Sequence, residues 1–173
     1  MKKTAYHEAG HAIIATQTIN LTYGLELYNS GNYLGSAFQK FQIQKYLRQD
    51  PSAVRLTINN DQNEIDFIKK NLEGYILTLL AGQISERIYL NLPTLSTPNF
   101  IPESDDEKFG EALHWYCSFM GYTLNNAKLF KCYHDINLKL HESLSGNETL
   151  WFLISILAES LYNSRKKKLS GFK

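Results

Sequence analysis

Two histidines and a glutamate near the start of the chain have the types and spacing of a metal-dependent hydrolytic site. His7 and His11 lie four residues apart, and Glu8 directly follows the first of them in the sequence HEAGH. If this stretch is helical, residues four apart lie on one face, one turn apart, so both imidazoles can point at a single ion. Neutral imidazole nitrogens are common Zn²⁺ ligands. The sequence therefore predicts a zinc site that includes His7 and His11.

Glu8 is suited to a role beside the metal rather than on it. It lies about 100° around a helix from His7, so it does not easily share the ligand position. Water on zinc is far more acidic than bulk water, and a neighbouring carboxylate can take its proton and later pass it to a leaving amine. Ala9, Gly10 and Ala12 are small, which fits a helix packed closely around a site. We therefore predict that Glu8 is a general base.

The third ligand that such a site requires is not expected among the remaining histidines. Catalytic zinc sites combine three protein ligands with one open position. His114, His134 and His141 lie far along the chain on expected helices, among lysine, aspartate and glutamate residues. We interpret these three as solvated or lightly packed residues, which leaves a carboxylate as the third ligand.

Acidic residues cluster directly before a helix with an apolar stripe. Asp105 lies four residues before Phe109, the first apolar residue of that stripe, so it extends the buried face by one turn. Asp106 lies about 100° further around the helix. Helix geometry thus favours Asp105 as the ligand and leaves Asp106 as the alternative. A third interpretation is that Ser104 or Asp105 only caps the helix.

The elements that must position these residues are mostly helices. Apolar residues at three- and four-residue spacings predict five of them. These cover residues 4–18, 64–89, 105–120, 125–143 and 150–167. Residues 23–41 hold two β-prone runs around the turn sequence NSGN, which predicts a hairpin. We therefore expect one domain over residues 1–173, mainly α with a small antiparallel β element.

Composition limits the partners that the chain can have. The net charge is +1, which provides no overall field for nucleic acid, so no nucleic-acid partner is expected. The most apolar stretch, residues 150–158, is far shorter than the roughly 20 residues of a membrane span. The two cysteines, Cys117 and Cys132, form no C-x-x-C pair and indicate a reducing compartment. We therefore expect a cytoplasmic protein without a membrane span.

Several motifs together resemble the peptidase domain of the FtsH-type ATP-dependent zinc metalloproteases. The sequence AYHEAGHAII is similar to the zinc-binding helix of that family, and YLGSAF to its strand with a Leu-Gly pair. The sequence LLAGQISERIYL is similar to a later family helix with Gly-Arg-Ala-Ala-Glu-Glu. Sixteen residues separate Asp105 from Gly121, which matches the family spacing between the ligand aspartate and a helix-ending glycine.

The resemblance implies a zincin-like fold and a set of roles. His7, His11 and Asp105 would bind Zn²⁺ as the cofactor. Glu8 would be the general base, and Glu86 would hold a ligand histidine from behind, as carboxylates often do at metal sites.

The resemblance also implies how substrate binds. Leu34, Gly35 and Ser36 would belong to an edge strand that pairs with an extended polypeptide. The chain departs from the family because it holds no G-x-x-x-x-G-K-[ST] loop and no membrane helices, and because FIPES replaces a glycine-rich turn before Asp105. We therefore expect either a free-standing relative of the peptidase domain or a fragment, with homo-oligomerisation left open.

The expected function is that of an ATP-independent zinc endopeptidase. Its substrate would be an unfolded polypeptide or one dedicated protein. The alternative is a non-catalytic adaptor or regulator of a larger ATP-dependent protease that keeps the peptidase fold. Glu8 favours the enzyme, because an adaptor needs no base beside a metal.

Overall fold

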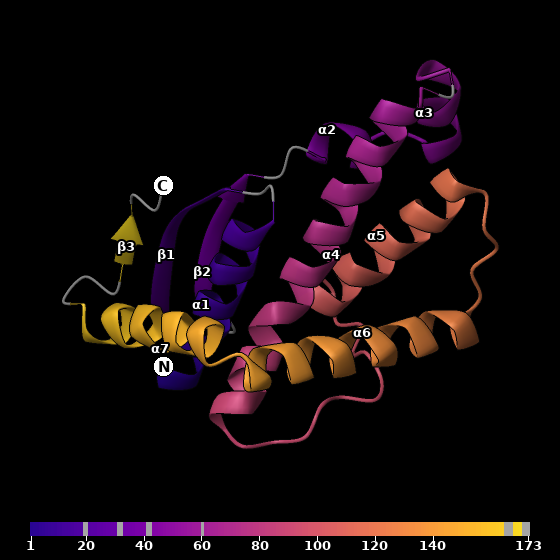
Figure 1. Cartoon of the computed structure of the whole chain (residues 1–173). Helices are drawn as coiled ribbons and strands as arrows, with labels where there is room; N and C mark the ends of the chain where they lie inside the picture. The colour runs from indigo at the N-terminus through magenta and orange to yellow at the C-terminus, as the bar shows by residue number, and fades with distance from the viewer. Residues whose placement is uncertain (19–20, 31–32, 41–42, 60, 165–167, 171–173) are drawn as a thin grey trace.

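The computed structural model describes the chain except for residues 19–20, 31–32, 41–42, 60, 165–167 and 171–173. The described part is mainly α-helical, as the apolar spacing predicts, and it contains seven helices. The helices are α1 (Lys2–Gln17), α2 (Gln44–Leu47), α3 (Pro51–Thr57), α4 (Gln62–Tyr89), α5 (Asp105–Met120), α6 (Asn126–Gly146) and α7 (Glu148–Asn163). The strands are β1 (Leu21–Ser30), β2 (Tyr33–Lys40) and β3 (Lys168–Ser170) (Figure 1).

The hairpin expected over residues 23–41 is formed by β1 and β2. They pair antiparallel, with Leu27 opposite Gly35 and Leu25 opposite Ala37. The turn residues 31–32 lie outside the described part of the chain. β3 pairs with the other side of β1, so the strand order is β2-β1-β3. In the described part of the chain, β2 is therefore an edge strand.

The last helix is shorter than the sequence predicts. The helix expected over residues 150–167 is α7, which begins at Glu148 and ends at Asn163. Leu161 is its last buried apolar residue, and the basic run that follows offers no apolar face to pack on a neighbouring helix. Beyond it, Leu169 packs against the core from β3. The end of the chain thus adds a strand, which helical spacing does not reveal.

Helix α1 lies at the centre of the arrangement. It packs against the sheet, α4 and α7 (Figure 1). The crossing with α4 is close because small residues meet there: a Cβ atom at Gly10 would lie 2.5 Å from the carbonyl oxygen of Ala81. Real Cβ atoms do not approach an oxygen so closely, so only glycine fits this crossing. The backbone of α4 consequently lies against the helix that carries the histidines.

Helix α5 reaches the same region by packing on the other side of α4. Ser104 caps it, because its Oγ accepts a hydrogen bond of 3.2 Å from the backbone N–H of Glu107. Gly121 ends it in a left-handed conformation, with a φ of 75°. Among the helices that the structure describes, none has the length and apolar character that crossing a bilayer requires.

Candidate metal centre

Three side chains from two helices converge on one point. His7 and His11 come from α1, and Asp105 is the first residue of α5. The two Nε2 atoms lie 3.0 Å apart. Asp105 Oδ2 lies 3.2 Å from His7 Nε2 and 3.1 Å from His11 Nε2. We call these three residues the metal group, because each offers a ligand atom and the atoms form a nearly equilateral triangle.

The triangle has the right size for a metal ion. Zinc lies about 2.0–2.2 Å from nitrogen and oxygen ligands, so the ligand atoms of a tetrahedral site are about 3.4 Å apart. The observed sides of 3.0–3.2 Å are close to this value. An ion about 2 Å from all three atoms would sit just outside their plane and keep one position open. The metal group could therefore hold a metal ion.

His11 is oriented by the backbone of α4. Its Nδ1 lies 2.6 Å from the carbonyl oxygen of Thr78, and a carbonyl only accepts hydrogen bonds, so Nδ1 carries the proton. The lone pair is then on Nε2, the atom that faces Asp105. Gly82 leaves space for the ring: a Cβ atom there would lie 2.6 Å from Cε1 of His11. The packing of α1 on α4 thus fixes both the position and the tautomer of this imidazole.

His7 has an acidic neighbour behind it. Glu86 Oε2 lies 3.6 Å from Nδ1 of His7, within ion-pair range. The other carboxylate oxygen, Oε1, accepts a hydrogen bond of 3.1 Å from Nζ of Lys3. Glu86 therefore lies behind His7, on the side of the ring away from Asp105, and pairs there with Lys3.

The two neighbouring aspartates have separate partners. Asp105 faces the histidines, whereas Asp106 is buried and accepts three hydrogen bonds. Its donors are Gln83 Nε2 at 2.9 Å, the hydroxyl of Tyr133 at 2.9 Å and the backbone N–H of Asn99 at 2.6 Å. The choice between the two carboxylates, which the sequence leaves open, falls on Asp105. Asp106 instead ties α4, α6 and the loop before α5 to the first turn of α5.

Sequence analysis missed this role of Asp106. The apolar stripe of α5 suggests that Asp105 is the more deeply placed residue, but Asp106 is the buried one. Two of its partners, Gln83 and Tyr133, lie 23 and 27 residues away along the chain, so the local sequence pattern does not predict them. The only signal is the acidic pair itself, in which one residue has no assigned ligand role.

The charges of the metal group are strongly coupled. Burial lowers the pKa of His7, but the carboxylates of Asp105 and Glu86 outweigh burial and raise it to about 10. Burial raises the pKa of Asp105, and the two imidazoles overcome this and hold it well below its usual range. The ion pair with His7 lowers the pKa of Glu86 to about 2, against the effect of burial. These shifts favour a cationic His7 between the carboxylates of Asp105 and Glu86.

Glu8 lies under the sheet rather than in the metal group. It is only 5% exposed, and burial raises the pKa of its carboxyl, against the imidazoles of His7 and His11, which lower it. Gly35 of β2 packs directly over it: a Cβ atom at Gly35 would lie 2.7 Å from Oε1 of Glu8. The edge strand thus touches the expected base. The side chains of Leu34 and Ser36 lie outside the described part of the structure.

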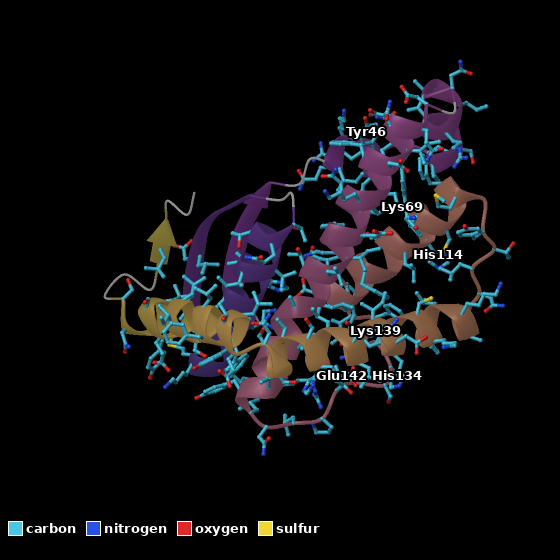
Figure 2. The ribbon with its side chains drawn as sticks, viewed as in Figure 1. Tyr46, Lys69, His114, His134, Lys139 and Glu142 are labelled. Atoms are coloured by element: carbon cyan, nitrogen blue, oxygen red, sulfur yellow. The ribbon has the colours of Figure 1, made fainter. Side chains whose placement is uncertain are left out.

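The other histidines and both cysteines lie elsewhere. His114 is exposed on α5 and His134 on α6 (Figure 2), and His141 is half-buried on α6. Cys117 and Cys132 are free thiols, each partly buried. None of these five belongs to the metal group, which is the only such cluster among the described residues.

Comparisons with models of known protein families, with curated proteins and with solved structures find no match for this chain.

We predict that the two aspartates separate metal binding from stability. Asp105→Asn removes the negative ligand and should weaken zinc binding by more than 100-fold, beyond the roughly 10–100-fold typical of groups behind a ligand. Asp106→Asn should keep the metal but lower the free energy of unfolding by about 1–3 kcal/mol, because an amide cannot accept all three hydrogen bonds. Metal analysis and chemical denaturation check this. Loss of zinc in Asp106→Asn, with zinc retained in Asp105→Asn, would contradict this assignment.

A second prediction concerns the space that Gly82 leaves for His11. Gly82→Ala places a methyl group on the imidazole, so the ring must move and zinc affinity should fall at least tenfold, as for loss of an orienting group. Gly146→Ala is the matched control, because a Cβ atom there meets nothing within 4 Å. Isothermal titration of zinc into both variants measures the difference. Equal affinities would show that α4 does not position His11.

The charge of His7 makes metal binding release a proton. Because the pKa of His7 is raised to about 10, the metal-free site holds a proton at neutral pH that the ion must displace. Between pH 6 and 8, zinc affinity should rise by about tenfold per pH unit. Calorimetric titration of zinc in buffers of different ionisation enthalpy measures the number of protons released on binding. Binding that releases none at pH 7 would show that His7 is neutral there.

Proposed function

We propose that this chain is a zinc endopeptidase that cleaves unfolded polypeptide segments. The observation that carries the proposal is the convergence of His7, His11 and Asp105, with separations of 3.0–3.2 Å, next to the buried carboxyl of Glu8. Two imidazoles and one carboxylate with an open position suit Zn²⁺. Mg²⁺ and Ca²⁺ prefer all-oxygen sites, so they are weaker candidates.

The metal and Glu8 would divide the chemistry. A bound Zn²⁺ would polarise a peptide carbonyl and make a water molecule more acidic. Glu8 would accept the proton of the attacking water on its carboxylate and then donate it to the nitrogen of the leaving amine. Burial keeps solvent away from Glu8, and the pKa that burial raises makes the carboxylate a better base. His7 and His11 oppose that rise, so the carboxylate can still form.

The edge strand β2 supports the choice of an extended substrate. A polypeptide can add to a free sheet edge through main-chain hydrogen bonds, but only where its own backbone is extended and unpaired. Gly35 places this edge directly over Glu8. A segment paired with β2 near Gly35 would therefore have a peptide bond close to the base. Folded proteins would need to expose such a segment first.

The arrangement also supports a distant relation to the FtsH-type peptidase domain. The helix with the histidines is followed by a hairpin, then by α4 with Gly82 against His11 and Glu86 behind His7. Asp105 opens α5, which ends at Gly121. This order of elements and the position of Glu86 are those that the resemblance implies, and we propose the relation on that basis.

Replacing the base is the direct test of the proposed function. Glu8→Gln should keep about one zinc ion per chain and lose about 10²–10⁴-fold in the cleavage rate of an unfolded casein substrate. The wild-type activity should disappear with a chelator and return with zinc. Glu142→Gln, on α6 (Figure 2), is the matched control and should leave the rate unchanged.

Two other outcomes would redirect the proposal. Zinc binding without cleavage of any unfolded substrate would favour the adaptor role instead. Full activity in Glu8→Gln would contradict the role of Glu8.

A further inference from the structure

Lys108 lies beside the metal group on α5. It follows Asp105 by three residues, and residues with this spacing lie on the same helix face with Cβ atoms about 5–6 Å apart. Helical side chains lean toward the N-terminus of their helix, so Lys108 leans toward the turn that carries Asp105. Its backbone N–H donates to the carbonyl oxygen of Ser104 at 3.1 Å, which fixes its place in the first turns of the helix. The side chain is exposed.

The ammonium of Lys108 makes no ion pair with an acidic side chain that the structure describes. Within the described part of the chain it has no ion-pair partner, although other lysines do. Lys2, Lys3 and Lys131 each form one. The carboxyl that feels the ammonium of Lys108 is Glu8, whose pKa burial raises and whose pKa the imidazoles and Lys108 lower. Because Lys108 lies one helical turn from Asp105, its side chain lies beside the metal group.

A substrate would have to pass this cation. A segment that pairs with β2 over Gly35 and reaches Glu8 also meets the first turns of α5, since Asp105 completes the metal group there. A lysine ammonium is a compact charge with three donors, and it binds a carboxylate without requiring a fixed approach. An exposed ammonium loses little by pairing with an anion that arrives with the substrate.

We propose that Lys108 is a specificity residue that binds a carboxylate of the substrate next to the scissile peptide bond. This inference rests on the proposed function, because it takes β2 and the metal group as the place where a polypeptide binds. The carboxylate comes either from an Asp or Glu side chain or from the C-terminus of the substrate. The substrate class is then acidic segments, or chains cleaved near their C-terminal end.

The test uses short dye-labelled peptides of one sequence and the zinc-loaded protein. Two pairs of these peptides are compared. The members of the first pair carry either Glu or Gln beside the central peptide bond, and the members of the second pair have either a free or an amidated C-terminus. Fluorescence anisotropy measures affinity, and product analysis measures kcat/KM. We expect the carboxylate member of one pair to bind about two- to fivefold more tightly and to be cleaved more efficiently by about the same factor. The pair that shows the preference identifies the source of the carboxylate.

Lys108→Met removes the charge at similar length and should abolish the preference, and Lys108→Glu should reverse it. Lys139→Met on α6 (Figure 2) is the matched control and should keep it. Zinc content and thermal melting verify that each variant is folded. Equal binding of all peptides, no binding of any, or a preference that survives Lys108→Met would overturn the inference.

The same data separate this inference from the proposed function. Cleavage without any carboxylate preference overturns the role of Lys108 and leaves the endopeptidase in place. A carboxylate preference in binding that depends on Lys108, without cleavage, supports Lys108 and overturns the endopeptidase.

Discussion

The close crossing of α1 and α4 is the constraint on which the rest of the site depends. Gly10 and Gly82 leave no side chain where the two helices meet, so the imidazole of His11 fits against the backbone of α4. There the carbonyl oxygen of Thr78 accepts a hydrogen bond from its Nδ1–H. A ring that is fixed in position and tautomer loses little freedom when it binds an ion, and this lowers the cost of binding. The packing of α1 on α4 therefore sets the position of His11 within the metal group.

The charges around the metal group are balanced. Uncompensated charges in a half-buried cluster would be costly, but here each has a partner. His7 lies between Asp105 and Glu86, and Glu86 is held in turn by Lys3. Asp106 is separately satisfied by three donors and anchors the turn from which Asp105 reaches the histidines. Lys108 is the cation beside this cluster that has no such partner among the described residues.

The local part of the site could be predicted from the sequence, because spacing along one helix decides it. His7 and His11 are four residues apart, and helix geometry alone places them together. The aspartate that joins the two histidines could be predicted less well. Asp105 meets His7 across 98 positions of the chain, so the choice between Asp105 and Asp106 depends on how α5 packs on α4.

Other features have no local signal at all. The strand β3 follows a lysine-rich run and forms only because β1 offers it a free edge. The contact of Gly35 with Glu8 likewise depends on how the hairpin lies on α1. Spacing rules describe one element at a time, whereas these contacts are made between elements.

X-ray absorption at the zinc edge of the purified protein tests the central claim most directly. The account predicts a first shell of nitrogen and oxygen atoms at about 2.0–2.1 Å, with the outer-shell scattering of two imidazoles. That scattering should weaken in His11→Ala. A sulfur ligand, a shell without imidazole, or a protein that retains no zinc would contradict the account.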